Sequence, residues 1–253
     1  MKNIILCEGK TDSILLSYYL GKVVGWNFNK KLTKRIALPI RNWENEEVNV
    51  YTKGEDELII WAVGGQSNFD YAITQIIKVN RISEKEHAYK KVIIIRDRDV
   101  IEDEQIVLKE IQDVFNANHI SIEITINNNW SSSEYVNEYN EKEQTKEKNE
   151  IKVLPIIIPF DKAGALETFI LDAICEIGEE ESHIVGKSRE FISSFSLTKY
   201  LNTQRLKVKG ELAVALGTLF PQKTFTPIDS MLKNINWEEY KTIQQGFKKL
   251  EEI

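Results

Sequence analysis

The chain has 253 residues, of which 42% are apolar, and its formal net charge is −6. This composition supports a substantial core, and it argues against a disordered chain and against a protein that coats nucleic acid through a broad basic surface. Two cysteines are too few for a zinc cluster or a disulfide framework, and Cys7 lies in an apolar run where we expect a buried thiol. No segment is long enough to span a bilayer, and the first apolar stretch is too short for a signal peptide, so we expect a cytoplasmic protein without membrane association.

Apolar runs and amphipathic segments alternate through the first half of the chain. Residues 3–7 form an apolar run that predicts a buried strand, which ends at Glu8. Thr11 or Asp12 can cap the helix expected after it, whereas the pattern assigns no regular structure to residues 26–50. The later elements are expected in this order: a strand at 58–63, a glycine break, a helix from Asn68 or Asp70 through Ile77, a strand at 92–95, a helix at 104–115 and an edge strand at 120–126.

The second half of the chain changes in character. Residues 127–150 are rich in Asn, Ser, Glu and Lys without apolar periodicity, and they predict an exposed polar insertion. A strand over residues 153–160 and a helix that continues through Ile174 follow this insertion. From Ser182 to the end of the chain, we expect only helices.

Strands that alternate with helices predict an α/β fold, in which a mostly parallel sheet is flanked by helices. We expect this Rossmann-like domain over residues 1–180 and a C-terminal helical lobe over residues 181–253. In such sheets, the active site lies outside the carboxyl ends of the strands. The residues that follow the predicted strands include Glu8, Gly64, Gly65, Asp97 and Asp99. The fold therefore gathers acids that are far apart in the sequence at one edge of the sheet.

These clustered acids indicate a divalent cation. Mg²⁺ prefers carboxylate oxygens and shares its shell with substrate phosphates, whereas carboxylates clustered without a cation would repel one another. The i, i+2 spacing of Asp97 and Asp99 lets both side chains reach one ion. Each acid also has a simpler explanation, since Asp-x-Asp serves turns, Asp12 can be a helix N-cap and Glu8 a charge at the sheet rim. Their order at successive strand ends favours a site for Mg²⁺ or Mn²⁺.

Two segments resemble the motifs of TOPRIM domains. Residues 4–12 resemble the first motif, a strand that ends in Glu-Gly with an acid four residues after the Glu. Residues 92–99 resemble the second motif, a strand that ends in Asp-x-Asp, and the intervening glycine pair is similar to a glycine turn of that domain. The likeness covers about residues 1–126. It implies a TOPRIM fold that works on nucleic-acid phosphates, with a metal site formed by Glu8, Asp12, Asp97 and Asp99.

The chain departs from the second TOPRIM motif at one position, which limits the TOPRIM families that it resembles. Many TOPRIM domains have a third acid two residues after the Asp-x-Asp pair, where this chain has Ile101, followed by Glu102 and Asp103. This departure argues against the topoisomerases and primases. The acid four residues after Glu8 is closer to the OLD-family nucleases, although the chain has no phosphate-binding loop of their ATPase domain.

Small stand-alone bacterial TOPRIM proteins, some of which are effectors of anti-phage systems, are more similar still. Their later sequence blocks resemble Gly164-Ala165-Leu166-Glu167 and the tail from Leu206 to Trp237. By this resemblance, Glu167 joins the metal shell, and Lys207 or Lys209 contacts the scissile phosphate. Complementation of a helix dipole by Glu167 and ordinary solvated lysines remain the alternatives.

These observations favour a metal-dependent endonuclease in which water attacks a phosphodiester of DNA or RNA. Asp97, Asp99 and Asp12 would hold the ion, and Glu8 would be a ligand or the general base. A lysine of the tail, taken as Lys209, would neutralise charge in the transition state.

Two other classes remain open. The first is a catalytically silent TOPRIM subunit that binds or senses nucleic acid within a larger complex. The second is a nucleotide-sugar transferase with an Asp-x-Asp metal site, which leaves the Glu-Gly motif unexplained. The resemblance is also compatible with an ATPase partner protein and with a homo-oligomer.

Overall fold

The chain forms two compact units in a computed structural model that describes residues 1–34, 38–41, 44–100, 103–136, 148–196, 199–223, 228–233 and 235–253. The first unit comprises residues 1–96 and 102–157 together with Ile253, and the second comprises residues 97–101 and 158–252. The sequence pattern had placed a single boundary at residue 180. By contacts, the segment around Asp99 groups with the C-terminal part of the chain, and the boundary at residue 180 stays a prediction.

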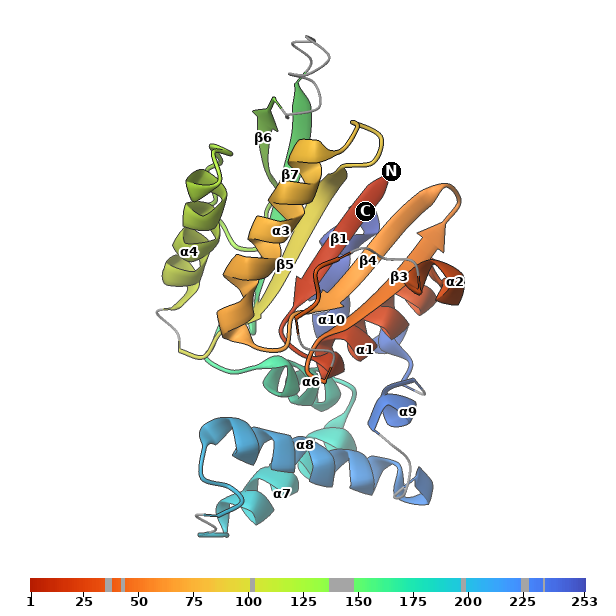
Figure 1. Cartoon of the computed structure of the whole chain (residues 1–253). Coiled ribbons are helices and arrows are strands. Elements are labelled where there is room, and N and C mark those ends of the chain that lie inside the picture. The colour runs from red at the N-terminus through yellow and green to blue at the C-terminus, as the bar shows by residue number, and fades with distance from the viewer. Residues whose placement is uncertain are drawn as a thin grey trace. The chain divides into compact units, whose positions relative to one another are not determined.

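Within the described residues, the sheet has seven strands in the order β2-β3-β4-β1-β5-β7-β6 (Figure 1). The strands are β1 (Lys2–Cys7), β2 (Asn27–Phe28), β3 (Glu47–Lys53), β4 (Asp56–Ala62), β5 (Tyr89–Asp97), β6 (Ser131–Tyr135) and β7 (Asn149–Ile158). β1 pairs in parallel with β4 and β5, whereas β2 with β3, β3 with β4, and β6 with β7 pair antiparallel. The predicted α/β class is confirmed, with a parallel centre and antiparallel edges.

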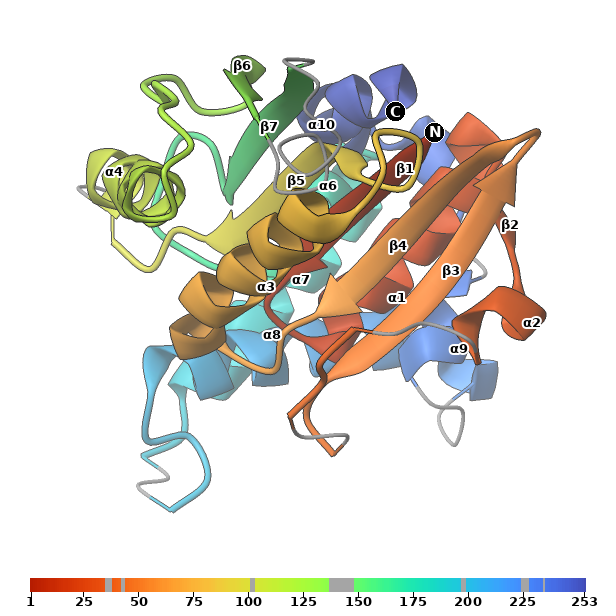
Figure 2. The same ribbon diagram turned by 45° about the horizontal axis from the view of Figure 1, so that its top comes forward.

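Helices cover both faces of this sheet in the first unit. α1 (Lys10–Tyr19) lies on one face, and α3 (Phe69–Ile82) and α4 (Asp103–Ala117) lie on the other, as two views show (Figures 1 and 2). Shorter helical segments are η1 (Leu20–Val24), α2 (Lys30–Thr33) and η2 (Gln66–Asn68). The strands between these layers are buried on both sides, which explains their continuous apolar runs.

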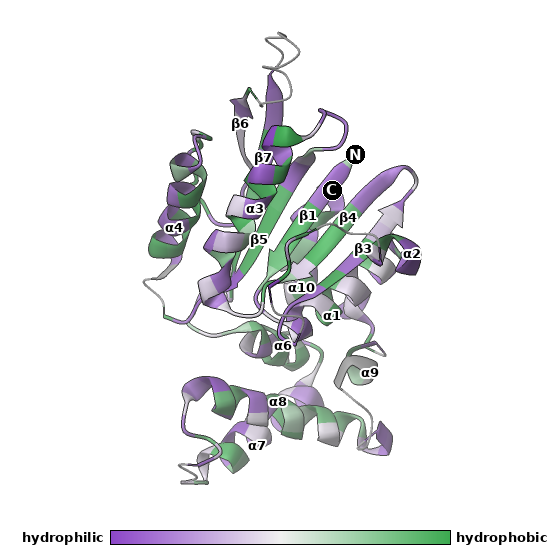
Figure 3. Ribbon diagram, viewed as in Figure 1, coloured by the Kyte–Doolittle hydropathy of each residue, from purple (hydrophilic) through white to green (hydrophobic). Residues whose placement is uncertain are grey.

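The alternation of side chains along β1 divides its apolar run between the two faces. Ile4 and Leu6 belong to the core that α3 and α4 cover, whereas Ile5 and Cys7 point to the opposite face. The central strands are hydrophilic at their N-terminal ends and hydrophobic over the rest of their length (Figure 3). The prediction of a buried Cys7 thiol is confirmed.

An antiparallel hairpin occupies part of residues 26–50, for which the pattern assigned no structure. β3 alternates buried Val48 and Val50 with less buried residues, and it turns into β4 at Gly54. Gly54 has a φ of 61°, a left-handed conformation that favours glycine. The alternating valines and this turn were therefore a usable hairpin signal that the sequence analysis missed.

The edge strand predicted over residues 120–126 is wrong. The alternation was read correctly, because Ile120, Ile122 and Ile124 are buried in the core. However, the segment is irregular, and side chains of α4 accept its backbone amides: Asn116 Oδ1 at 3.2 Å from Ile122 N, and Gln112 Oε1 at 2.8 Å from Ile124 N. These side-chain acceptors replace the neighbouring strand that the pattern had implied.

The polar insertion predicted over residues 127–150 is partly wrong. It contains β6, which pairs with the start of β7, and Tyr135 of β6 is buried. Asn127 also fastens the segment to β7, because its side chain exchanges hydrogen bonds with the backbone of Ile157 at 2.9 and 2.8 Å. The rest of the predicted insertion, residues 137–147, lies outside the described residues.

The second unit is helical, as predicted for the C-terminal part. Its helical segments are α6 (Leu166–Cys175), α7 (Glu179–Ser193), α8 (Gln204–Leu219), η3 (Pro221–Lys223), α9 (Ile228–Lys233), η4 (Trp237–Glu239), α10 (Lys241–Phe247) and η5 (Lys248–Glu252). α7 and α8 form a helical hairpin (Figure 1). Phe169 of α6 packs edge-on against Phe160 and against Phe247 of α10, with ring centroids 6.0 and 5.7 Å apart. Of the helices described, none combines the length and the apolar character needed to cross a membrane.

Candidate functional site

The first candidate acid, Glu8, directly follows β1 in the first unit. Its side chain is buried, and its backbone carbonyl accepts the amides of both Gly64 and Gly65 at 3.0 Å. A side chain at Gly64 would lie 3.2 Å from the Asn45 backbone, and the φ of 78° there also favours glycine. The glycine turn noted in the sequence therefore has a structural role: it brings the chain after β4 into contact with Glu8, the residue that follows β1.

Asp12 has the capping role that the sequence left open. Its Oδ2 accepts the amide N–H of Gly9 at 2.5 Å, so the carboxylate closes the first turn of α1. The Glu-Gly-x-x-Asp motif is thus a helix start as well as a set of acids. A metal-ligand role for Asp12 stays a prediction.

Asp97 is the last residue of β5 and belongs to the second unit. Its side chain is buried, and its Oδ1 accepts the backbone N–H of Leu166, the first residue of α6, at 3.0 Å. A helix N-terminus stabilises a negative charge through its unpaired amides and its dipole. The carboxylate of Asp97 is therefore held in position by the start of α6.

Arg98 joins the end of β5 to the loop before α6 through an isolated antiparallel bridge with Gly164. Its N–H donates to Ile158 O, and its carbonyl accepts the N–H of Gly164, both at 2.6 Å. Asp99 follows this bridge in a bend of the chain. Asp97 is buried whereas Asp99 is exposed, so the second acid is the one open to solvent.

Arg98, which stands between the two acids in the sequence, has a buried side chain. Burial lowers its pKa from the usual value, and the negative charge of Asp161 acts in the opposite direction. An arginine remains charged under these conditions. The acid whose charge acts on the Arg98 guanidinium is therefore Asp161, in the loop before α6.

Gly164 allows α6 to start at this point. A Cβ at this position would lie between 2.7 and 2.9 Å from three atoms of the Thr168 side chain, closer than atoms can pack. Its φ of 156° is also unusual for other residues. Glycine is thus required where the loop approaches both Arg98 and the first turn of the helix.

Glu167, in the first turn of α6, is the second buried acid of this unit. It is 7% exposed, and its Oε1 lies 3.6 Å from Nζ of Lys209 on α8. Lys209 is 46% exposed, so its ammonium group reaches solvent as well as Glu167. The structure thus distinguishes the two lysines of the tail, because within the described residues the one with an acidic partner is Lys209 and not Lys207.

Asp172 stands on the same helix in a different charge environment. Lys162 Nζ lies 2.6 Å from its Oδ2, and Arg189 Nη2 lies 3.4 Å from its Oδ1. Arg189 also approaches Glu211 of α8 at 3.9 Å. These ion pairs join the loop before α6 to α7 and α8, and we interpret Asp172 as a structural residue.

The donor atoms of the candidate site suit a hard cation. Among the described residues, no three His, Cys, Asp or Glu side chains form a group arranged to hold a metal. Mg²⁺ is commonly bound by one or two carboxylates together with waters and substrate phosphates. Two buried carboxylates, Asp97, which contacts the first residue of α6, and Glu167, in the first turn of that helix, are ligands of the type that such a Mg²⁺ site uses.

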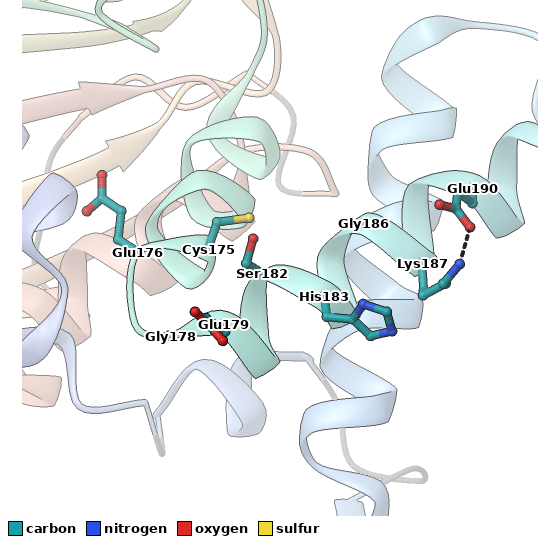
Figure 4. A pocket seen from close by; sticks show the side chains of 9 residues that line it. All are labelled: Cys175, Glu176, Gly178, Glu179, Ser182, His183, Gly186, Lys187 and Glu190. Carbon is teal, nitrogen blue, oxygen red and sulfur yellow. Dashed lines mark hydrogen bonds and ion pairs between the residues drawn. The ribbon is translucent and has the colours of Figure 1, made fainter.

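Cavities among the described residues lie away from the predicted site residues, and two of them differ in their lining. One, of about 720 Å³, is lined by the end of α6 and by one face of α7, and it includes Cys175 and His183 but no predicted site residue (Figure 4). The other, of about 360 Å³ and within the first unit, is lined by Gln66, Ser67, Asp70, Arg96 and Glu110. The buried Arg96 pairs with Glu110 at 2.9 Å. Sequence reasoning missed this arginine, although it directly precedes Asp97.

The fold and the site define the class of this protein: an α/β protein with a C-terminal helical unit and carboxylates at the ends of its central strands. The chain belongs to the family described as "Protein of unknown function (DUF3226)", whose model matches residues 2–248. A solved structure, the hypothetical protein PH0156 from Pyrococcus horikoshii OT3, is similar in fold, with a TM-score of 0.54 and 15% identity. The similarity covers 98% of this chain and 99% of that one. None of the curated proteins compared with the chain matches it.

Proposed function

We propose that this protein is a Mg²⁺- or Mn²⁺-dependent nuclease that hydrolyses phosphodiester bonds of DNA or RNA. The observation that carries the proposal is the arrangement at the start of α6. There, the buried Asp97 at the end of β5 accepts the first backbone amide of α6, the buried Glu167 stands in the first turn of that helix, and Lys209 Nζ lies 3.6 Å from Glu167 Oε1. Two acids and one mobile cation are the groups needed to hold a metal ion and a phosphate together.

Five acids are the proposed ligands of the metal ion. Asp97 is fixed by the Leu166 amide, and Asp99 is an exposed acid two residues further along the chain; the proposal makes both of them ligands. Glu8 follows β1, the parallel neighbour of β5, and the proposal assigns it a place as ligand or as general base. Asp12 and Glu167 complete the proposed set. When bound, the ion would polarise the phosphoryl oxygen and lower the pKa of a water.

Lys209 would act on the substrate. Its ammonium group is half exposed and is held near a buried acid, so it can contact a phosphate oxygen without leaving Glu167. A positive charge at that place compensates the charge that develops on the phosphate in the transition state. The TOPRIM-like motifs support the same assignment, because the acids stand at the motif positions that resemble that domain.

A catalytically silent binding or sensor subunit is the second candidate. The observation in its favour is that three proposed ligands already have partners: Gly9 for Asp12, Leu166 for Asp97 and Lys209 for Glu167. On this alternative, the acids maintain the fold, and catalysis belongs to another protein. An ATPase partner and a place in anti-phage defence belong to either proposal.

The purified protein tests the proposal with plasmid DNA and structured RNA, with and without Mg²⁺ or Mn²⁺. We expect metal-dependent cleavage that Asp97→Ala and Glu8→Ala abolish while circular dichroism shows a folded protein, although Asp97→Ala also loses the contact with Leu166 and should melt at a lower temperature. Glu150→Ala, which removes an exposed carboxylate of β7, is the matched control and should cleave normally. Full cleavage by folded Asp97→Ala would overturn the site, and binding without cleavage by the unaltered protein would favour the second candidate.

A further inference from the structure

A further cavity, of about 640 Å³, lies along the helical hairpin of the second unit. Ile184 and Phe191 of α7 and Val214 of α8 provide the apolar part of its lining. Phe191 is 52% exposed, and its ring packs edge-on against the exposed ring of Phe195, with ring centroids 4.8 Å apart. This face of α7 therefore combines an apolar cavity with rings that are open to solvent, and such a surface is typical of an interaction site.

The same face carries one charge of each sign. Lys187 and Glu190 both line the cavity, and Lys187 Nζ lies 2.7 Å from Glu190 Oε2 (Figure 4). Both side chains are more than half exposed, so their pair contributes little to the stability of the helix. A partner surface with charges of one sign would be attracted by one of the two groups and repelled by the other. The charges therefore favour a partner surface that itself carries one cation and one anion.

We propose that this face of α7 binds the same face of a second copy of the chain and forms a homodimer with a twofold axis. Such an interface is made by the same patch on both subunits, so the patch must be complementary to itself. The exposed ring of Phe191 lies at its own cavity, so the ring of each copy enters the cavity of the other. The cation of each copy likewise meets the anion of the other, and the interface as a whole is neutral.

The spacing of residues on α7 fits an antiparallel pairing of the two helices. With the twofold axis between Lys187 and Ser188, Ile184 of each copy lies opposite Phe191 of the other, because the two residues are equally far from the axis. In this register, Lys187 is displaced from Glu190 of the second copy by only about 3 Å along the helices, which permits an ion pair between the copies. One arrangement thus satisfies both the apolar and the charged groups, and it is independent of the proposed nuclease function.

Sedimentation velocity of the full-length, unaltered protein measures the dimer. The concentrations run from about 1 µM to about 300 µM, because an interface made by one helix face belongs to the small, weak class. The buffer contains EDTA and no nucleic acid, so that neither metal nor substrate contributes. We expect a monomer that converts into a dimer as the concentration rises. A monomer at every concentration would overturn the proposal.

Two exposed apolar side chains locate the interface. Phe191→Ser should weaken the dimer by at least about thirtyfold, because aromatic residues at the centre of an interface provide much of its binding energy. Ile82→Ser is the matched control, since Ile82 is 65% exposed on α3 in the other unit. It should change the dimer affinity by less than about twofold. Equal effects of the two substitutions would place the contact elsewhere and would overturn the proposal.

Charge reversal tests the pairing between copies. Lys187→Glu and Glu190→Lys should each weaken the dimer by about five- to fiftyfold, because like charges then face one another across the axis. An equimolar mixture of the two single variants should dimerise within about threefold of the unaltered affinity, because each acid then meets a cation of the other chain. Neither variant can form the ion pair within its own helix, so recovery in the mixture can come only from contact between the copies.

Each result decides the proposal. Loss of the dimer in Phe191→Ser, together with its recovery in the mixture of charge-reversed variants, supports the antiparallel interface. A mixture that remains as weak as the two single variants would overturn it, since the charges would then not face one another. A dimer that Phe191→Ser leaves intact would overturn it as well. The three substituted residues of α7 are exposed, and native thermal stability of each variant is the control for folding.

Discussion

Glu167 and Asp172 lie five residues apart on α6, yet their surroundings differ. Asp172 is paired with Lys162 and with Arg189, and these contacts connect three elements of the second unit. Glu167 is more deeply buried and has its ion pair with Lys209, at the longer distance of 3.6 Å. The acid with more positive charge around it is the more exposed one.

This comparison shows how to separate a structural acid from a functional one. Surrounding cations neutralise Asp172, and little capacity remains there for a further positive charge. A buried carboxylate with one distant, mobile cation is only partly compensated, and it can gain from a metal ion. The start of α6 is therefore the place where a divalent cation would relieve an electrostatic cost.

The largest expected effect comes from neutralising each acid in turn. Glu167→Gln should reduce metal-dependent cleavage by about a hundredfold or more, because it removes a ligand and leaves the shape of the side chain. Asp172→Asn should change the cleavage rate by less than about threefold, because Asp172 has a structural role and no proposed contact with the metal. The fold should tolerate the substitution, since half-exposed ion pairs contribute only about 0–1 kcal/mol each to the free energy of unfolding. Initial cleavage rates and thermal melts of both variants provide the measurement, and equal losses of activity would remove the distinction between the two acids.

A smaller effect is expected from the lysines of α8. Lys209→Ala removes a charge-assisted phosphate contact of about 1.5–3 kcal/mol, so cleavage should fall by roughly ten- to a hundredfold. Metal affinity, measured by titration calorimetry with Mn²⁺, should remain nearly unchanged. Lys207→Ala should cleave at the normal rate. Small and equal effects of the two substitutions would show that Lys209 has no role at the phosphate.

The smallest effect concerns the stability of the helix start that carries Glu167. Gly164→Ala forces a Cβ against Thr168 and should lower the free energy of unfolding by about 1–3 kcal/mol. Gly217→Ala is the control, because nothing lies within 4 Å of a Cβ at that helical position, and it should raise stability by about 0.5–1 kcal/mol. Urea denaturation measures both values, and unchanged stability of Gly164→Ala would mean that the loop adapts to the added carbon.

The central part of the fold followed from local patterns. The runs that became β1, β4 and β5 are continuous because both faces of those strands are buried, and the helices between them show regular apolar spacing. The segment around Ile122 was misread because its alternation reports burial and not pairing. Only the tertiary structure shows that Asn116 and Gln112 supply its hydrogen-bond acceptors.

Local sequence patterns also predicted part of the candidate site. The acids of the two motifs could be selected because each follows a strand, and a helix start could be read at Asp12. The contact of Asp97 with Leu166 could not, since it joins residues 69 positions apart and involves a backbone amide without a sequence signature. The choice between Lys207 and Lys209 likewise depended on which face of α8 contacts α6.

The dependence of Asp97 on Leu166 has a consequence for the synthesis of the protein. A ribosome produces the carboxylate 69 residues before the amide that positions it, and the lysine partner of Glu167 follows 42 residues after that acid. A chain released early therefore carries the acids without the helix that orients them. On the proposed function, a chain that stops before α8 lacks the lysine that contacts the phosphate, and we expect it not to cleave nucleic acid.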